Sequence, residues 1–322
     1  MDKAAMINIL EQVAAATARA RDDLVLCGGM AAFAICKMAD AEADVALTED
    51  VDLAMERQRH RQKTKLAEPP LLGDDLKKSG FSCEYKSLPI GGGIPAEKWV
   101  KEGESFYIEF LTEDHNQNVH SISGISAQGL SYFSMSLANT FLYELPSGTS
   151  IRVVSPEAFA MHKILTFNRR RSDFKKYKDL YYVAIVALTA YRSIGQLAAD
   201  MRALRVAQGW QRTAASNLRA IEKSLGDWTD KIMGNDPARF LTAARIRIVY
   251  ITLAAAYAEI PEAVMGNAAE ARAPDPTRIC AACGKFFRTR AETGAGENTG
   301  DVRLGGSGQA GLGGSEICAM CS

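Results

Sequence analysis

The stretch Thr48-Glu-Asp-Val-Asp-Leu53 places two aspartates on either side of a single apolar residue. On a β-strand, the two-residue alternation would project Asp50 and Asp52 from one face and send their apolar neighbours into the core behind them. Two neighbouring carboxylates repel each other, and that cost persists most naturally where a divalent cation lies between them. The same pattern also occurs by chance on surface strands, and for the isolated motif that interpretation is favoured at roughly two to one.

A third acidic residue and a pair of glycines supply further parts of the same chemistry. Glu109 lies inside the apolar run Phe106-Tyr-Ile-Glu-Phe-Leu111, where an acid without a role is unexpected. Gly28-Gly29 follows the strand-like Leu24-Val-Leu-Cys27 and precedes a helix predicted from Met30 to about Met38, so backbone amides there can hold phosphate oxygens. Such a glycine pair alone is more often plain turn chemistry. Three carboxylates, a divalent cation and a phosphate-binding turn together predict phosphoryl or nucleotidyl transfer.

The patterning divides the chain into three parts and predicts an α+β fold. Short apolar runs indicate strands up to residue 155, and helical periodicity begins at Ser155-Pro156, with Ser as N-cap and Pro in the first turn. We predict a mixed-sheet domain at 1–155, an all-helical domain at 156–268, and a linker with a small C-terminal module at 269–322. The predicted strands cover 24–27, 51–55, 81–87, 106–111 and 150–154, and the predicted helices cover 4–21, 30–38, 157–168, 173–192, 194–224 and 237–260.

The charge balance limits the classes of partner. Thirty-eight basic residues cancel thirty-eight acidic ones, and with an isoelectric point near 6.9 no global field draws the chain to nucleic acid or to a membrane. The longest apolar stretch, Ile248–Ala258 with one Thr inside it, is shorter than the ~18 residues of a bilayer span. The N-terminal residues do not have the pattern of a secretion signal. We expect a cytoplasmic protein without a membrane partner.

Five short stretches along the chain contain either paired glycines or charged side chains that could take part in catalysis or binding. They are Gly28-Gly-Met-Ala31, Thr48-Glu-Asp-Val-Asp52, Ile108-Glu-Phe-Leu-Thr112, Pro156-Glu-Ala-Phe-Ala-Met-His-Lys163, and Arg170 with Lys178-Asp179. In type and order they resemble the motifs of bacterial nucleotidyltransferase-fold proteins of the DNA polymerase β-like superfamily. Within it, the chain is most similar to the GSU-type nucleotidyltransferases and to the AbiEii toxin group of abortive-infection and toxin–antitoxin systems. The resemblance runs from about residue 24 to residue 185.

The resemblance implies a metal-dependent transfer of a nucleoside monophosphate from an NTP, with release of pyrophosphate. By position, Gly28 and Gly29 would hold the triphosphate. Asp50 and Asp52 would bind Mg²⁺ or Mn²⁺, and Glu109 would complete the triad as a metal ligand and base. The acceptor would be an RNA, such as a tRNA 3′ end, or a protein side chain; a toxin role with an antitoxin partner is implied by the resemblance alone. Twenty residues separate the paired glycines from Asp50, more than in many polymerase β-like enzymes, and the intervening loop can absorb the difference.

The first helix of the helical part carries Lys163 four residues from both Phe159 and Phe167. A lysine held there beside a carboxylate cluster can reach a phosphate as a point charge. The alternative is an exposed helix lysine whose stem covers apolar surface, and spacing alone gives the two interpretations about even odds. The resemblance favours phosphate binding and extends it to Arg170 and Lys178 in the basic run that follows.

Several other polar residues and cysteines are expected to have structural roles rather than functional ones. His162 is expected to pack or to form a hydrogen bond rather than to bind a metal. Lys175 and Lys176 are expected to be solvated surface residues. Three cysteines upstream of the tail are expected to be small core residues: Cys27, Cys36 and Cys83.

The C-terminal tail contains two C-x-x-C pairs, Cys280 with Cys283 and Cys318 with Cys321, separated by 34 residues. Four thiolates at this spacing can close a tetrahedral Zn²⁺ site of the zinc-ribbon type, with the glycine-rich insertion extruded as a loop. The metal would supply the folding energy that so short a segment lacks. Nucleic-acid contact and a purely structural zinc both stay open. The alternative function is an inactive nucleotidyltransferase fold that binds nucleic acid or regulates through this tail, although the intact acid triad argues against it.

Overall fold

The computed structural model describes residues 3–39, 45, 48–56, 71–87, 96–170 and 172–258. These residues belong to one compact unit, Met1–Arg272, which contains both the sheet and the helices. The predicted boundary near residue 155 falls where the last strand is followed by the helical part, and the division into domains stays a prediction. The four tail cysteines and the proposed zinc module lie outside the described residues.

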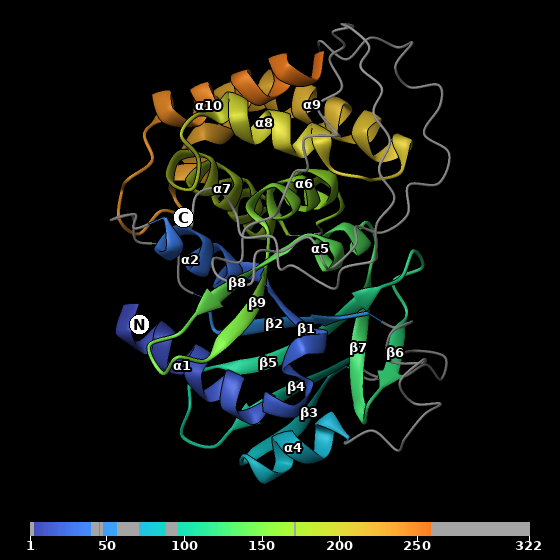
Figure 1. Ribbon diagram of the computed structural model, residues 1–322. Helices are drawn as coiled ribbons and strands as arrows, with labels where there is room; N and C mark the ends of the chain where they lie inside the picture. Colours follow the sequence, from blue (N-terminus) through green and yellow to red (C-terminus); the bar gives the residue numbers. More distant parts are fainter. Residues whose placement is uncertain are drawn as a thin grey trace, which may run out of the picture. The chain divides into compact units, whose positions relative to one another are not determined.

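The strands of the described residues form one mixed nine-stranded sheet, which confirms the predicted α+β class (Figure 1). Along its main path the strand order is β3-β4-β5-β2-β1-β9-β8, and β7 pairs with both β5 and β6. The strands are β1 Leu24–Cys27, β2 Asp50–Met55, β3 Phe81–Ser87, β4 Ala96–Lys101, β5 Tyr107–Glu113, β6 Val119–Ile122, β7 Ile125–Leu130, β8 Thr140–Glu144 and β9 Ser150–Val154.

Strand β5 has neighbours along both edges. One edge pairs in parallel with β2, from Asp50 opposite Tyr107 to Ala54 opposite Leu111. The other edge is shared: β4 pairs with its beginning in the antiparallel direction, and β7 pairs with its end in parallel. The sheet therefore divides at β5 into two branches, and residues of β2, β5 and β7 lie on a common face.

Helices cover both faces of the sheet and form a separate layer beyond one of them. They are α1 Lys3–Ala16, η1 Ala18–Asp23, α2 Gly28–Met38, α4 Leu72–Lys78, α5 Ser134–Ala138, α6 Pro156–Thr166, η2 Phe167–Arg169, α7 Asp173–Thr189, α8 Ile194–Ala203, α9 Gln208–Met233 and α10 Ala243–Ala258. Figure 1 shows α6 to α10 gathered at one end of the described chain and α1 and α4 toward the other.

The alternation along β1 and β2 decides which helix covers which face. Leu24 and Leu26 of β1, together with Leu53 of β2, line a small cavity with the buried Leu10 and Val13 of α1. The side chains that alternate with these leucines along β1 and β2 point to the opposite face of the sheet, toward α2 and the later helices. The apolar side of β2 is thus used for the core, as the alternating sequence predicts, and its acidic side is left for the other face.

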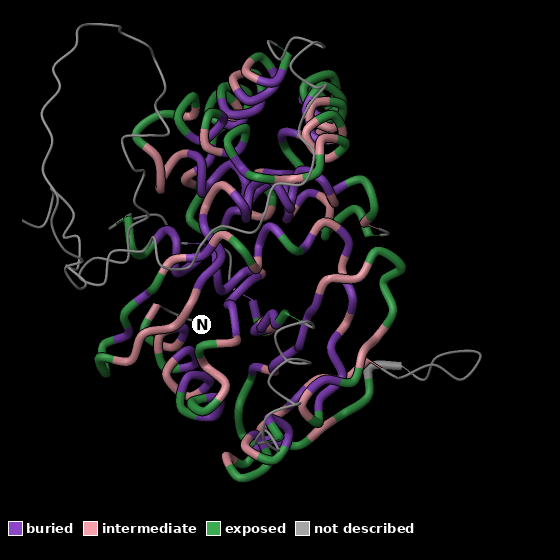
Figure 2. The backbone as a smooth tube through the Cα atoms, turned by 45° about the vertical axis from the view of Figure 1, so that its right-hand side comes forward, coloured by how far each residue is buried: buried purple, intermediate pink, exposed green. Residues whose placement is uncertain are grey.

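The helical part is held together mainly by apolar burial. Figure 2 shows buried segments where these helices meet each other and the sheet. Helix α7 is buried without interruption from Tyr177 to Ala187 apart from Lys178, and the Tyr250 hydroxyl of α10 donates a 2.6 Å hydrogen bond to the Leu180 carbonyl of α7. Helix α9 instead buries a single stripe at helical spacing and exposes the rest. Among the described helices, none has the length and apolar character that crossing a bilayer requires.

Several predicted helix boundaries are wrong for identifiable reasons. Helix α2 begins at Gly28 rather than Met30, so the paired glycines form its first turn. The segment predicted as one helix at 194–224 forms two helices, α8 and α9, because the chain leaves the helical conformation after Ala203. The side chain of Gln211 in α9 donates a hydrogen bond to the Met201 carbonyl, which has no partner within α8. The helix predicted from residue 237 begins at 243, since the Asp236 carboxylate accepts backbone hydrogen bonds that hold the preceding loop.

The predicted cap of α6 is also only partly correct. Ser155 occupies the N-cap position and Pro156 the first turn, as expected. The Ser155 side chain, however, forms no cap hydrogen bond and instead donates to the Glu157 carboxylate at 2.6 Å. Strands β4, β6, β7 and β8 and helices α4 and α5 were not predicted. In most of them the apolar residues are few or irregularly spaced, whereas β8 has three consecutive apolar residues, Phe141-Leu-Tyr143, and was simply missed.

Candidate active site

A cavity of about 280 Å³ lies between the sheet and helices α2, α6 and α7. Its sheet side is formed by β2, β5 and β7, and its helical side by the N-terminus of α2 and by residues of α6 and α7. All eight non-cysteine residues predicted for the site lie on its wall. They are Gly28, Gly29, Asp50, Asp52, Glu109, Lys163, Arg170 and Lys178.

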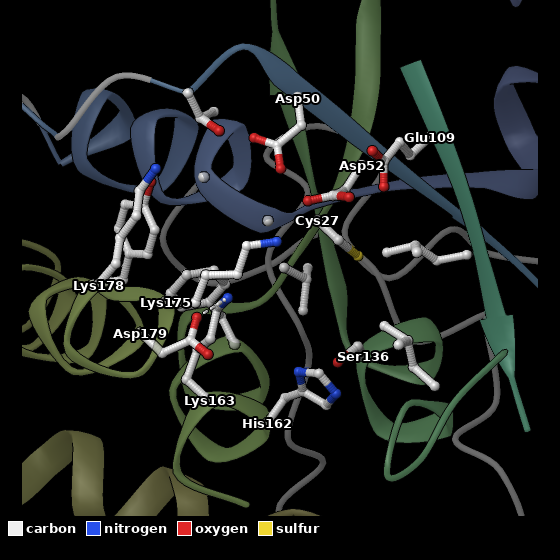
Figure 3. Close-up of a pocket in the computed structure, with 18 of the residues that line it drawn as sticks. Cys27, Asp50, Asp52, Glu109, Ser136, His162, Lys163, Lys175, Lys178 and Asp179 are labelled. Atoms are coloured by element: carbon white, nitrogen blue, oxygen red, sulfur yellow. Dashed lines mark hydrogen bonds and ion pairs between the residues drawn. The ribbon is translucent and has the colours of Figure 1, made fainter. Parts of the chain in front are cut away.

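The three predicted carboxylates meet on one face of the sheet. Asp50 and Asp52 leave the same face of β2, and Asp52 lies directly opposite Glu109 in the parallel pairing with β5. Val51, between the aspartates, is fully buried on the other face. Figure 3 shows the three carboxylates at the same side of the cavity. Glu109 is 8% exposed, so its carboxylate lies against the sheet rather than in bulk water. We call the part of the sheet face that carries Asp50, Asp52 and Glu109 the acidic floor of the cavity.

The pKa of Tyr107 shows the effect of the negative charges of the three carboxylates. Tyr107 precedes Glu109 on the same face of β5 and is the register partner of Asp50. Burial raises the pKa of the Tyr107 phenol, and the charges of Asp50, Glu109 and Asp52 raise it further. The floor therefore disfavours further negative charge and favours a cation.

The carboxylates suit Mg²⁺ chemically but do not form a complete cage. Hard divalent cations prefer carboxylate oxygens, and Mg²⁺ is commonly held by one or two carboxylates together with substrate phosphates. Among the described residues, no group of three His, Cys, Asp or Glu side chains is close enough to hold a metal ion by itself. Asp50 and Asp52, with Glu109 across the strand pair, are the residues that would hold such an ion, with phosphate oxygens supplying the remaining ligands.

The two glycines let α2 approach the carboxylates closely. Gly28 has φ of +65°, and a Cβ added to it would overlap Asp52 Oδ2. A Cβ at Gly29 would lie 2.5 Å from the Tyr182 hydroxyl and 2.7 Å from Thr48 Cγ2. The absence of side chains at both positions therefore brings the positive N-terminal end of α2 against the acidic floor, where backbone amides can bind an anion.

A buried ion-pair cluster forms the helical wall. The Lys163 ammonium lies 2.5 Å from Asp179 Oδ1, and Arg170 Nε lies 2.6 Å from Asp179 Oδ2. The Lys163 ammonium also lies 5.6 Å from the centroid of the Phe159 ring and 5.7 Å from that of Tyr182. Because Lys163 is 8% exposed, the interpretation of this residue as a solvated surface lysine is wrong.

The cluster of Lys163, Arg170 and Asp179 has a net positive charge, and it lines the same cavity as the carboxylates. Burial alone would raise the pKa of Asp179, but the charges of Lys163 and Arg170 and their hydrogen bonds outweigh it and hold that pKa below its usual value. Burial lowers the pKa of Lys178, against the opposing charge of Asp50. One buried carboxylate thus faces two paired cations, and Lys178 adds a third on the same wall.

His162 forms the end of the cavity near β7 and α5. It is 8% exposed, and its ring packs edge-on against Phe133, with centroids 5.1 Å apart and planes at 64°. Burial, aided by the charges of Lys163 and Arg170, lowers the pKa of His162 from 6.5 to about 3, so the imidazole is neutral near pH 7. The ring packs as the sequence predicts.

With this geometry established, comparison with known proteins gives the family. Residues 5–205 match a family described as nucleotidyltransferase, which is well over half of the chain. The chain belongs to this nucleotidyltransferase family. A search of curated proteins finds no match to the sequence. Among solved structures, the chain is similar to an antigenic nucleotidyltransferase-like protein from Paracoccidioides brasiliensis, at 17% identity and a TM-score of 0.40, over 70% of this chain and 91% of that one.

The nucleotidyltransferase family match includes every described site residue, but sequence reasoning omitted several wall residues from the predicted set. Asp179 was named in the fifth motif but given no role, because only the fold brings it against a lysine sixteen positions earlier in the chain. Lys175, expected to be only solvated, is exposed yet lines the cavity together with the exposed Phe174. Cys27, expected in the core, is buried and also reaches the cavity; burial and the Asp52 charge raise the pKa of its thiol.

Proposed function

We propose that this nucleotidyltransferase uses a divalent metal, Mg²⁺ or Mn²⁺, to transfer a nucleoside monophosphate from an NTP to an RNA or protein acceptor. The observation that carries the proposal is the meeting of Asp50, Asp52 and Glu109 on one sheet face, opposite the N-terminus of α2 and the Lys163 cluster. Carboxylates for a cation and positive groups for a triphosphate then lie within one cavity, which is the arrangement that phosphoryl-type transfer requires.

In this proposal each wall performs a separate task. The amides at Gly28 and Gly29, with Lys163 and Lys178, bind the phosphate oxygens and orient the triphosphate. Asp50, Asp52 and Glu109 would hold the cation, and a bound Mg²⁺ would supply charge neutralisation and alignment of the phosphates. Asp179 keeps the Lys163 ammonium directed along the cavity wall through the 2.5 Å contact.

Glu109 is the residue proposed to accept the proton of the attacking group. A hydroxyl oxygen of the acceptor forms a bond to the α-phosphorus, and the bond from that phosphorus to the bridging oxygen of the β-phosphate breaks. Pyrophosphate leaves with that electron pair, and the hydroxyl proton passes to a Glu109 carboxylate oxygen. Its position opposite Asp52 keeps this base beside the proposed cation site.

Transfer of label from NTPs tests the proposal. The full-length protein is incubated with each α-³²P-labelled NTP, Mg²⁺ or Mn²⁺ and a cell extract, and the RNA and protein fractions are examined separately. We expect label in one fraction, its loss in Asp52→Asn and with a chelator, and its retention in Asp74→Asn, which changes an exposed acid on α4. Label in neither fraction would contradict the transfer reaction.

The alternative function is nucleic-acid binding or regulation by an inactive nucleotidyltransferase fold. The observation that favours it is the lack of a complete three-ligand metal group among the described residues. Under this alternative, the wild-type protein would bind nucleic acid without transferring label, and Asp52→Asn would bind equally well. An electrophoretic mobility assay on the same preparations distinguishes the two functions.

The finer assignment to the GSU-type or AbiEii-toxin-like branch belongs to this proposal. It is supported by the order of the five motifs and implies a cytoplasmic, toxin-like component with an antitoxin partner. Induced expression in a bacterial host tests it. We expect growth arrest with the wild type and normal growth with Asp52→Asn; equal growth of both strains would contradict a toxin role.

The zinc site of the tail is a separate part of the proposal. Cys280, Cys283, Cys318 and Cys321 would hold one Zn²⁺ through four thiolates. Elemental analysis of protein purified without chelator is expected to give about one zinc per chain. Substituting Cys280 and Cys283 by Ser should remove it, and wild-type protein free of zinc would contradict the site.

A further inference from the structure

One end of the cavity differs in chemistry from the charged walls. It lies where the ends of β5 and β7 approach helices α5 and α6, and apolar and neutral polar side chains form it. The opposite end carries the N-terminal amides of α2 and the Lys178 ammonium. Figure 3 shows His162 and Ser136 on one side of the cavity and Lys178 on the other. The residues at the neutral end are Leu111, Gln128, Leu130, Phe133, Ser136 and His162.

The His162 ring lies at the wall of this end of the cavity, and among the described residues one of its two nitrogens has no partner. The ring packs on Phe133, and a hydrogen bond to the Ser131 backbone engages one nitrogen. Because the neutral ring donates its single N–H to that carbonyl, Nε2 carries a lone pair and can only accept. Nε2 is buried, and within the described parts of the chain it has no hydrogen-bond partner. A buried acceptor without a partner is unfavourable, so a donor from a ligand would stabilise this end of the cavity.

This end lies across the cavity from Lys178 (Figure 3), which suggests which part of a nucleotide reaches it. If the triphosphate occupies the α2 and Lys178 end, its α-phosphate lies near the carboxylates. The nucleoside then extends away from the β- and γ-phosphates, toward Phe133 and His162. The apolar side chains of Leu130 and Phe133 suit the face of a planar ring, and a neutral acceptor suits a donor on its edge.

We propose that this end of the cavity binds the nucleobase of the NTP and that His162 Nε2 accepts a hydrogen bond from an exocyclic amino group of the base. This inference rests on the proposed transferase function and adds a specificity-determining residue to it. An amino group projects beyond the ring and can reach an acceptor in the wall. Uracil has no amino group, and its N3–H stands between two carbonyl oxygens whose lone pairs would repel that of the imidazole.

The environment of His162 argues against a role in proton transfer. Its pKa of about 3 means that the ring holds a proton too weakly to act as a base near neutral pH. The nearby cations Lys163 and Arg170 keep it neutral and leave it as a hydrogen-bond acceptor. His162 is therefore a residue for recognition, and its substitution should change nucleotide preference more than the chemical step.

Nucleotide binding by the full-length protein tests the inference. Dissociation constants for ATP, CTP, GTP, UTP and inorganic tripolyphosphate are measured with the wild type, His162→Leu and His162→Gln. In the wild type we expect one of the amino-bearing NTPs to bind more tightly than UTP. His162→Leu should weaken that NTP about tenfold and leave UTP and tripolyphosphate unchanged, and His162→Gln, which restores an acceptor, should recover most of the loss.

A base analogue without the amino group gives the matched control. Purine riboside triphosphate serves for ATP, pyrimidin-2-one riboside triphosphate for CTP, and ITP for GTP. Removing the amino group should weaken binding to the wild type by the same factor as His162→Leu, and should have no effect in that variant. Unchanged tripolyphosphate binding shows that the phosphate site of each variant is intact.

The outcomes separate this inference from the transferase proposal. If the wild type transfers label but His162→Leu keeps the nucleotide preference, the role of His162 is wrong and the transferase proposal stands. Tightest binding of UTP, or an equal loss for all ligands including tripolyphosphate, also overturns the role of His162. If the wild type neither binds NTPs nor transfers label, both proposals fail.

Discussion

The Lys163 ammonium and the Asp179 carboxylate are in contact at 2.5 Å, although their side chains are only 10% and 5% exposed. They come from neighbouring helices α6 and α7, and Arg170 contacts the second oxygen of the same carboxylate. Two cations therefore depend on one buried anion. Removing that anion would leave the buried Lys163 ammonium poorly solvated, which is far less favourable than losing an exposed ion pair.

Asp179→Asn is expected to lower the free energy of unfolding by about 3–5 kcal/mol, because it leaves Lys163 as a buried charge without its counter-ion. Urea unfolding at pH 7 measures the change. Asp227→Asn, at an exposed position on α9, is the matched control and should unfold within about 0.5 kcal/mol of the wild type. Equal midpoints for Asp179→Asn and the control would contradict the structural importance of the cluster.

His162 should make stability depend on pH. Its pKa falls from 6.5 to about 3 on folding, so the unfolded chain binds a proton between those values and the folded chain does not. This contribution to stability is complete above pH 6.5 and is lost as the pH falls toward 3. Denaturant unfolding from pH 3 to 7 should give a shallower pH dependence for His162→Gln than for the wild type. His115→Gln, at an exposed histidine, should follow the wild type; a wild-type slope in His162→Gln would rule out this linkage.

Gly28→Ala should damage both stability and nucleotide binding. The residue has φ of +65°, which costs a non-glycine residue about 1–2 kcal/mol, and its Cβ would overlap Asp52 Oδ2. We expect an unfolding free energy lower by more than that amount, with weaker NTP binding. Gly226→Ala is the control, because that glycine lies within α9 and has open space where a Cβ would be. It should be more stable by about 0.5–1 kcal/mol.

Lys178→Ala should weaken the binding of both NTPs and tripolyphosphate. The side chain lines the cavity, and hydrogen bonds to charged groups typically contribute about 1.5–3 kcal/mol, so we expect dissociation constants to rise about ten- to a hundredfold. Isothermal titration calorimetry at low salt measures the change. Lys223→Ala, which removes an exposed lysine of α9, should bind as the wild type does. Comparable affinity in the two variants would remove Lys178 from the phosphate site.

The sequence predicts most of the central strands because their patterns are local. Val51 and Leu53 enter the core behind Asp50 and Asp52, as the two-residue alternation requires. Strand β6, Val119-His-Ser-Ile122, and the adjoining β7 contain many polar or small residues, so no local pattern marks them. They are strands because they pair with each other and with β5, and such pairing is a property of the folded chain.

The site shows the same division between local and long-range information. Alternation alone is enough to place Glu109 on a common face with Tyr107, and the register with β2 then brings it opposite Asp52. The burial of Lys163 could not be read from its helix, because its partner is Asp179 on another helix. Spacing within one helix does not reveal contacts with the next, so spacing alone gave the two interpretations of Lys163 equal weight, and only the resemblance favoured phosphate binding.

The division of the sheet at β5 has a consequence for the rigidity of the site. This strand carries Glu109 and is hydrogen bonded on one edge to β2 and on the other to β4 and β7. Peeling it away would break pairings on both sides at once, so its amides should exchange with deuterated solvent only through global unfolding. We therefore expect the backbone that carries Glu109 to keep its position when a ligand binds.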